Sequence, residues 1–415
     1  MTKNDRKIKV LLSAYAVKPG SGSEPGVGWN FFKELSMIPT LDVYLITEIE
    51  FKSSILKESK KLGVKIENIF FQDIGDKARA MCWNQGDWRF YFYYRKWQLK
   101  IKERVIELNN QHSFDIIHHL NMIGFREPGF LNEVPNTKFV LGPLGGFKNA
   151  KISFLYEMYG FKVALLEFLK SILNFLNLFF PRISRTIKSA DQLFSAYPEG
   201  AQDLRSRLGV DCQVFPESGA QPIDPQSTVR PEIKALQPFF LFIAKNVPRK
   251  GLKLAIESFK QSGVQKSHQL LILGEDVLGD IPNYYKEKND ENILYLGHVT
   301  RNKVLELIKQ SKALLCTSLH EGTPHSVVET LTYGGEVICF ENFGHGFVGK
   351  GYARFISSNQ DYKSCVSDFA KEILNVSQHG IDYDQRQNRS KNFLKDNSWP
   401  KKAEILCKIY KNLID

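Results

Sequence analysis

The chain has 415 residues, of which 43% are hydrophobic, so it is long enough for two or three domains with large cores and is not a disordered polymer. Its formal net charge is +11. The charges are scattered, without an arginine-rich block, zinc-finger spacing or RNP-like aromatic pattern, which argues against a nucleic-acid partner and favours an enzyme that handles anionic substrates near a membrane.

Short apolar runs alternate with amphipathic helical periods in the first half of the chain. We expect buried strands at 7–14, 42–47, 64–70, 115–119, 138–142 and 192–196, and helices at 29–37 and 94–109. This alternation predicts a parallel sheet with helices on both faces. The run 10–17 is interpreted as the first strand rather than a signal peptide, because a glycine-rich turn follows it at once.

Two places in this half are candidates for contact with a ligand. The segment 21–29 contains Gly26 and Gly28, which would let the backbone approach a ligand closely, although a plain glycine turn is the alternative. It is not a G-x-G-x-x-G motif, so a dinucleotide site is not supported. The strand 115–119 ends in His118 and His119, either of which could be a site residue or a buried structural histidine. Arg126 and Glu127 follow, in a cleft-facing loop or a surface ion pair.

Residues 151–189 are rich in Phe, Leu and Ile with interspersed basic residues. Glu157 and Glu167 argue against a simple transmembrane helix. Two interpretations remain open: a pair of helices packed on the sheet, or a basic amphipathic surface that touches anionic lipid. The aromatic stretch 88–97 allows the same two interpretations. No stretch of the sequence is long and uncharged enough to span a bilayer.

A proline-rich linker divides the chain. Within it stand Pro216, Pro222, Pro225, Pro231 and Pro238. A second alternation follows, with strands expected at 239–244, 269–274, 293–297, 313–317 and 337–340. We therefore predict domains at 1–220 and 221–395, with an amphipathic C-terminal helix in 396–415. Two such α/β domains would bind ligands in a cleft between the carboxyl ends of their sheets.

The segment 318–340 is the most informative part of the sequence. It follows a strand, turns and opens a helix, for which Thr323 suits the N-cap and Pro324 the first helical position. The backbone N–H groups around this start would form a phosphate site. Its members are Gly322, Thr323, Pro324, His325 and Ser326. Six cysteines without a C-x-x-C pair indicate reduced thiols and no metal cluster.

Two carboxylates flank this phosphate site. Glu329 could accept hydrogen bonds from ribose hydroxyls, and Glu321 could face the sugar or the phosphate; two solvent-facing glutamates on an ordinary loop–helix joint are the alternative. Lys245 and Lys250 follow the strand 239–244 and could neutralise a pyrophosphate and a departing nucleoside diphosphate.

With these residues in place, 239–340 resembles the C-terminal domain of GT4-family glycosyltransferases. The family's Arg, Lys and Gly are met by Lys245 in place of the arginine and by Lys250-Gly251. Its E-G-x-P-x4-E is met by Glu321, Gly322, Pro324 and Glu329. The small-residue pattern that follows is only partly kept, with Thr330 and Thr332 in place of alanines and Glu336 in place of a proline.

The resemblance implies an α/β GT-B fold of two Rossmann-like, doubly wound domains facing an inter-domain cleft, with the last helix returning to the N-terminal domain. It also implies retaining transfer of a hexose-type sugar from a UDP- or GDP-sugar to a saccharide or lipid-linked acceptor. The expected setting is surface polysaccharide or lipopolysaccharide synthesis at the cytoplasmic side of the membrane, without metal or cofactor.

The resemblance also gives the site residues their roles. Glu321, Lys250, Lys245 and one of His118 and His119 would be catalytic. Gly26 and Gly28 would lie against the donor phosphate, and Glu275 matches an acid that follows a glycine in the family. Three alternatives remain: a nucleotide-sugar epimerase, a pyridoxal-phosphate-dependent phosphorylase, or a non-catalytic scaffold that binds a sugar nucleotide. The oligomeric state is not predicted.

Overall fold

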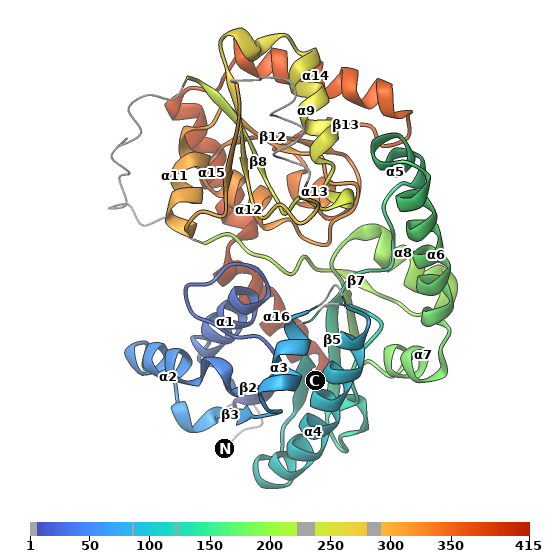
Figure 1. Cartoon of the computed structure of the whole chain (residues 1–415). Helices are drawn as coiled ribbons and strands as arrows, with labels where there is room; N and C mark the ends of the chain where they lie inside the picture. Colours follow the sequence, from blue (N-terminus) through green and yellow to red (C-terminus); the bar gives the residue numbers. More distant parts are fainter. Residues whose placement is uncertain (1–5, 85–86, 121, 123, 222–236, 280–291) are drawn as a thin grey trace. The chain divides into compact units, whose positions relative to one another are not determined.

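The structure is a computed structural model that describes residues 6–84, 87–120, 122, 124–221, 237–279 and 292–415. The chain forms two compact units, coloured by sequence in Figure 1. Unit 1 comprises Met1–Phe147, Leu173–Glu217 and Trp399–Asp415, and unit 2 comprises Lys148–Ile172 and Ser218–Ser398. Of the predicted linker, Pro222, Pro225 and Pro231 lie outside the described residues.

Unit 1 is built on a 7-stranded parallel sheet in the order β3-β2-β1-β4-β5-β6-β7. Its strands are β1 (Ile8–Ser13), β2 (Leu41–Glu48), β3 (Ile69–Gln72), β4 (Ile116–His119), β5 (Lys138–Leu144), β6 (Gln192–Ser195) and β7 (Gln213–Val214). Its helices are α1 (Ser23–Ser36), α2 (Lys52–Lys61), α3 (Asp76–Trp83), α4 (Arg89–His112), α7 (Pro181–Lys188), α8 (Pro198–Leu208) and α16 (Trp399–Ile414).

Unit 2 is built on a 6-stranded parallel sheet in the order β10-β9-β8-β11-β12-β13. Its strands are β8 (Phe239–Ile243), β9 (Gln269–Leu273), β10 (Ile293–Gly297), β11 (Ala313–Cys316), β12 (Glu336–Phe340) and β13 (Arg354–Ile356). Its helices are α5 (Ile152–Tyr159), α9 (Leu252–Gln261), α11 (Arg301–Gln310), α12 (His325–Thr332), α13 (Phe343–Gly349), α14 (Tyr362–Gln378) and α15 (Tyr383–Asn397). Helix α6 (Phe161–Leu178) begins in unit 2 and ends in unit 1.

Both faces of the unit 2 sheet are buried, which is why its strands are continuous apolar runs. Successive side chains of β8 point to opposite faces: Phe240 and Phe242 enter one core cluster, and Phe239 and Leu241 enter the other. Sheet order and burial agree with the predicted doubly wound α/β architecture.

Most predicted strands are confirmed, with three corrections. The short strands β7 and β13 were not predicted. The expected strand 64–70 is wrong in its first part, because residues Ile66–Asn68 form a 3-10 turn and β3 starts at Ile69. The buried Asn68 amide stabilises this turn by donating a hydrogen bond to the Val43 carbonyl at 3.1 Å.

The segment 151–189 forms three helices, α5, α6 and α7, where the sequence suggested a pair. Helix α5 contributes Phe154, Leu155 and Met158 to a core cluster of unit 2. In the aromatic stretch 88–97, Trp97 is buried against Tyr15, with ring centroids 5.0 Å apart, while Trp88 is 79% exposed. The stretch therefore combines core packing with surface exposure.

The C-terminal helix α16 belongs to unit 1, although α15 immediately before it belongs to unit 2. It packs on α1, and its buried Trp399 contacts the Phe31 ring edge-on at 5.0 Å between centroids. In Figure 1, the red helix α16 can be followed to its place beside the dark-blue α1.

Candidate functional site

The predicted site residues of unit 2 follow the carboxyl ends of its strands, where open parallel sheets bind ligands. The loop after β8 is attached to the end of β11 at Gly251. This glycine has φ +68°, and a Cβ there would lie 2.3 Å from the Thr317 carbonyl oxygen. The Thr317 hydroxyl in turn donates a hydrogen bond to the Gly251 carbonyl at 2.9 Å. Only glycine fits here, and the contact brings Lys250 next to the residues that follow β11.

Lys250 forms an ion pair with Glu321, the glutamate that precedes α12. Arg249 Nη1 lies 3.5 Å from the same carboxylate, which is only 10% exposed. Burial alone would raise the pKa of Glu321, but the charges of Lys250 and Arg249 outweigh it and hold this pKa well below its usual range. Glu321 is therefore ionised at neutral pH, and two cations that could meet a phosphate lie beside it.

Helix α12 begins one residue later than predicted. Pro324, not Thr323, is the N-cap residue, and its carbonyl accepts hydrogen bonds from the Val327 and Val328 amides at 3.1 Å. Pro324 has extended backbone angles, with ψ of 106°. The prediction of Pro324 as the first helical residue is thus wrong by one position. The segment from Gly322 to Ser326, which was predicted as a phosphate site, still leads into the first turn of α12. The backbone N–H groups of a first helical turn have no partner within the helix.

Glu329 lies within α12 and pairs with Arg301, the first residue of α11, at 2.6 Å. Burial raises the pKa of Glu329 even though Arg301 acts against it. Arg301 was not predicted from the sequence. A possible signal was its position, because it follows β10 and so lies at the same edge of the sheet as the other site residues.

His325 is the first residue of α12, and charges from both ion pairs act on it. Its Nδ1 is 2.9 Å from the Ser218 hydroxyl. Burial, aided by the charge of Arg301, lowers the pKa of His325 to about 4, and the charges of Glu321 and Lys250 also act on it. His325 is therefore neutral at pH 7. We call the set Lys250, Glu321, His325, Glu329 and Arg301 the unit 2 cluster.

Lys245 and Glu275 contact each other rather than a residue of the unit 2 cluster. They pair with each other at 2.9 Å, and their side chains are 67% and 60% exposed. The hydrogen bond to Lys245 keeps the pKa of Glu275 below its usual range. Among the residues that the structure describes, no ion pair links either of them to Glu321, so their roles at the donor remain predictions.

Two histidines that the sequence analysis missed lie beside Glu321. His345 of α13 is fully buried, and neither of its ring nitrogens has a hydrogen-bond partner within the described ranges. Burial lowers its pKa to about 4. The His320 ring packs edge-on against Phe343, with centroids 4.9 Å apart, and burial lowers its pKa to about 3. Both are therefore neutral at pH 7 and add no charge to the ion pairs of Glu321.

In unit 1, Gly26 and Gly28 lie in α1, which starts at Ser23. The plain glycine turn considered for 21–29 is therefore confined to the residues before Ser23. A Cβ at Gly26 would lie 2.1 Å from the Ser21 carbonyl oxygen, so this glycine allows close packing of the turn against its own helix. Its packing role is explained without a ligand, and contact of Gly26 and Gly28 with a donor stays a prediction.

The two histidines at the end of β4 have different surroundings, as expected for neighbours on opposite faces of a strand. His118 Nε2 is 2.8 Å from the Gly142 carbonyl oxygen, and its Nδ1 is 2.6 Å from the Tyr410 hydroxyl. Because a carbonyl only accepts, Nε2 carries the proton and Nδ1 accepts from Tyr410. Burial lowers the pKa of His118 to about 4.

His119 has one distant neighbour, Gln98, at 3.4 Å from its Nε2, and in the described part of the chain its Nδ1 has no hydrogen-bond partner. Burial, followed by the neighbouring His118, lowers its pKa to about 3. Since His118 already uses both ring nitrogens, His119 is the better candidate of the two for a site residue.

Arg126 and Glu127 do not form the ion pair considered from the sequence. Glu127 is buried between Arg95 and Arg182, each 2.6 Å from its carboxylate. Burial raises its pKa against the effect of both arginines. Arg126 instead donates to the Asn174 side chain at 2.7 Å. Both residues therefore have structural partners within unit 1.

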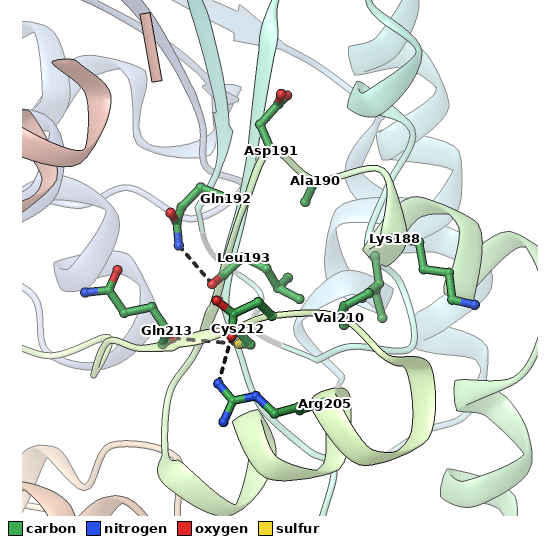
Figure 2. A pocket seen from close by; sticks show the side chains of 11 residues that line it. Lys188, Ala190, Asp191, Gln192, Leu193, Arg205, Val210, Cys212 and Gln213 are labelled. Atoms are coloured by element: carbon green, nitrogen blue, oxygen red, sulfur yellow. Dashed lines mark hydrogen bonds and ion pairs between the residues drawn. The ribbon is translucent and has the colours of Figure 1, made fainter. Parts of the chain in front are cut away.

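A pocket of about 560 Å³ lies elsewhere in unit 1, between α7, α8 and the starts of β6 and β7 (Figure 2). It is lined by residues such as Gln192, Arg205 and Cys212 and by none of the predicted site residues. Gln192 is the first residue of β6, so the pocket is at the amino end of that strand, opposite the end at which such sheets bind ligands. Arg205 is already paired with Asp211 at 2.7 Å. The pocket therefore carries no functional assignment.

Comparison with known proteins bears on unit 2 and on the fold. Residues 226–391 match the family model of glycosyl transferases group 1, which covers the whole unit 2 cluster but less than half of the chain. No curated protein matches the chain by sequence.

Solved structures resemble the chain over its full length. The N-terminal domain of trehalose-6-phosphate phosphatase from Candida albicans is 12% identical, with 100% of this chain and 98% of that chain covered and a TM-score of 0.65. The lipopolysaccharide outer core galactosyltransferase WaaB is 15% identical, with 98% and 99% covered and a TM-score of 0.59. HepE from Anabaena, solved with UDP-glucose, is 10% identical, with 98% and 100% covered and a TM-score of 0.56. At these identities the likeness shows the fold, which is GT-B, as predicted.

Proposed function

We propose that this protein is a retaining glycosyltransferase that transfers a hexose-type sugar from a UDP- or GDP-sugar to a saccharide or lipid-linked acceptor. The observation that carries the proposal is the unit 2 cluster, in which Lys250 pairs with Glu321 just before α12 and Arg301 pairs with Glu329 within that helix. It lies within the segment that matches glycosyl transferases group 1. The complex of HepE with UDP-glucose, a protein of the same fold, supports a nucleotide-sugar donor.

The chemistry we propose follows from the charges of the cluster. Lys250 and Arg249 supply positive charge next to the first turn of α12, where the helix dipole also favours an anion. A donor diphosphate bound there would be neutralised as the bond to the sugar breaks, which stabilises the leaving group. No general acid is then required for the departing phosphate.

Glu329 is the residue we propose for the ribose hydroxyls of the donor. A carboxylate accepts two hydroxyl donors, provided that it is ionised. Burial favours its protonated form, and Arg301 at 2.6 Å favours the ionised form that a diol needs. Arg301 is therefore a positioning residue for this contact. His119 is our candidate for contact with the donor sugar, and Lys245 and Glu275 are further candidates near the diphosphate.

Retention follows if the acceptor hydroxyl attacks from the face that the diphosphate leaves, with the departing phosphate accepting its proton. The acceptor class and the setting in surface polysaccharide or lipopolysaccharide synthesis at the cytoplasmic side of a membrane are part of the proposal. All six cysteines are free and buried, as a reducing compartment requires.

The experiment is a thermal-shift screen of the purified chain with UDP, GDP and ADP and their common sugars. A ligand at a hundredfold excess over its Kd stabilises the folded chain by about 2.7 kcal/mol, without any need for an acceptor. We expect one nucleotide family to raise the Tm, and Lys250→Met to abolish the rise. Lys363→Met, at an exposed position on α14, is the matched control and should leave the rise unchanged.

A positive nucleotide would then be tested with its labelled sugar donor. Release of nucleoside diphosphate that depends on an added acceptor supports transfer, and NMR of the product anomer tests retention. Conversion of the donor sugar without an acceptor would indicate an epimerase, and binding without any turnover would indicate a scaffold. If no nucleotide binds, the proposal is refuted.

A further inference from the structure

Helix α6 has polar side chains at the middle of its inward side, while most of its large apolar side chains are exposed. Ala164, Glu167, Ser171, Asn174 and Leu178 recur at spacings of three and four residues, which places them on one stripe of the helix. All five are buried or partly buried, as are their neighbours Val163 and Asn177. In an ordinary surface helix such a stripe would be apolar, whereas here its three central members are polar.

The polar stripe is held by specific contacts. The Glu167 carboxylate accepts hydrogen bonds from the Asn149 side chain at 3.0 Å and the Ala150 amide at 3.1 Å. The Asn174 side chain accepts a hydrogen bond from Arg126 at 2.7 Å. These contacts fix the rotation of α6 about its own axis. The helix cannot turn its apolar side inward without breaking them.

The outward side of α6 and the turn after it is almost wholly apolar. Residues 161–180 contain eleven of the 27 exposed large hydrophobic side chains of the described chain. They are Phe161, Leu165, Leu166, Phe168, Leu169, Ile172, Leu173, Phe175, Leu176, Phe179 and Phe180. Several are more than half exposed, such as Phe161 at 67% and Leu166 at 59%. A contiguous apolar surface of this kind marks an interaction site.

Exposed basic residues accompany this apolar face along the chain. Lys162 and Lys170 are exposed on α6, and Arg185 and Lys188 are exposed on α7, which follows it along the green part of the chain in Figure 1. Of the acidic residues between 152 and 188, Glu157 alone is exposed, because Glu167 is turned inward. An apolar face accompanied by exposed basic residues complements a bilayer with anionic headgroups, whereas two copies of this face would repel one another.

No single helix of the described chain is long and apolar enough to cross a membrane, although α6 and α7 together meet the test as a pair bent by 60°. The contacts of Glu167 and Asn174, and the burial of Ile183 and Ile187 in α7, tie this pair to the protein along its length. A surface position therefore fits the contacts, and a bilayer-spanning one does not.

We propose that α6 is a membrane-docking helix that lies in the plane of the bilayer interface. Its 18 residues would extend about 27 Å along the surface. The aromatic and leucine side chains enter the acyl boundary, and Lys162, Lys170, Arg185 and Lys188 contact anionic headgroups. This inference does not rest on the proposed chemistry.

The test is co-sedimentation of the full chain with vesicles of phosphatidylcholine alone and of phosphatidylcholine mixed with phosphatidylglycerol, without nucleotide. We expect binding to the mixed vesicles and weaker binding to the neutral ones. The double variant Leu169→Glu/Leu176→Glu should reduce binding to both at least tenfold, because two side chains no longer leave water. Lys170→Gln should reduce binding to the mixed vesicles about fivefold and leave the neutral ones unaffected.

A matched control carries the same kind of change elsewhere. Leu374 and Tyr383 are exposed on α14 and α15, so Leu374→Glu/Tyr383→Glu should leave vesicle binding unchanged. Far-UV circular dichroism melts should show that all variants fold, because every altered side chain is exposed.

Three results would overturn the proposal: no binding of the unaltered chain to either vesicle, binding of the Leu169→Glu/Leu176→Glu variant equal to that of the unaltered chain, or an oligomer that this variant dissolves while vesicles are not bound. The last would make the face an interface between two copies. None of these results depends on donor binding, so failure here and failure of the glycosyltransferase proposal are distinguishable.

Discussion

Replacement of Lys250 by methionine tests whether the ion pair of Lys250 with Glu321 contributes more to the free energy of unfolding than an ordinary surface pair does. The Glu321 carboxylate is 10% exposed and the Lys250 side chain 19% exposed, so both have lost most of their water. Removal of one partner of such a pair costs about 3–5 kcal/mol, because a buried charge is left uncompensated. Arg249 remains 3.5 Å from Glu321, so we expect the lower end of this range, about 3 kcal/mol.

The pH dependence gives this prediction a sign. In the unaltered chain the pKa of Glu321 lies below its usual value, so the stability it contributes is present above about pH 4.3 and is lost as the pH falls through the folded-state pKa. Without Lys250 the largest opposing charge is gone, so we expect burial to outweigh Arg249 and to raise that pKa above its usual value. The loss of unfolding free energy in Lys250→Met is therefore largest at neutral pH. It becomes smaller on acidification toward pH 4.3, as Glu321 becomes protonated in the folded state of the variant.

The assay must distinguish the two units. All five tryptophans lie in unit 1, so tryptophan fluorescence during urea unfolding follows that unit alone. Hydrogen exchange of peptides from β8, β11 and α12 reports on opening of unit 2. We expect faster exchange of those peptides in Lys250→Met at pH 7.5 than at pH 5, relative to the unaltered chain.

The matched control is Lys245→Met, the same substitution at the exposed pair with Glu275. It should produce no measurable change, because exposed pairs contribute little to stability. Equal effects of Lys245→Met and Lys250→Met, or a Lys250→Met deficit that grows on acidification, would refute the assignment of a buried, charge-compensated Glu321.

Three further outcomes are expected. Glu329→Gln should weaken binding of the nucleotide found in the screen at least tenfold, as measured by isothermal calorimetry. Because the glutamine still gives Arg301 a neutral hydrogen-bond partner, the circular dichroism melt of this variant should be nearly unchanged. His118→Phe should destabilise unit 1 by about 1–3 kcal/mol in urea, because the Tyr410 hydroxyl and a buried carbonyl lose their partner, whereas His119→Asn should lower turnover more than stability. Because burial lowers the pKa values of His118 and His119 to about 4 and about 3, stability should fall as the pH drops below about 6.5, and His118→Phe should flatten this fall in the fluorescence transition.

The sheets were predictable because parallel strands buried on both faces are short apolar runs bounded by turns. The run 239–244, for example, differs from β8 by only one residue. The sequence failed where local pattern and tertiary contact disagree. Alternation over 64–67 resembles a strand, but the hydrogen bond from Asn68 to Val43 turns the chain there. Likewise, glycines at 26 and 28 resemble a loop, although the helix α1 already includes them.

Some residues of the candidate site could likewise be predicted from the sequence, and others could not. The spacing of Lys250, Gly251, Glu321 and Glu329 can be read along the chain, because a strand end and a helix start hold them in place. A choice between His118 and His119 could not be read, since it depends on Tyr410, which is 292 residues away from His118. His345 was also not predicted, because nothing in the pattern 343–349 distinguishes a buried histidine from an exposed one.

Arg301 shows most clearly why partners matter for the interpretation of a motif. A glutamate in an E-x7-E pattern is assumed to be an anion, yet burial at Glu329 pushes its pKa upward and would favour the protonated acid. A protonated carboxyl donates one hydrogen bond and can no longer accept two from a diol with equal strength. Arg301, contributed by a helix that the motif does not include, opposes this protonation from 2.6 Å. Whether Glu329 can recognise a ribose therefore depends on a residue outside the motif, and a relative that keeps both glutamates but lacks this cation would be expected to bind its nucleotide less well at neutral pH.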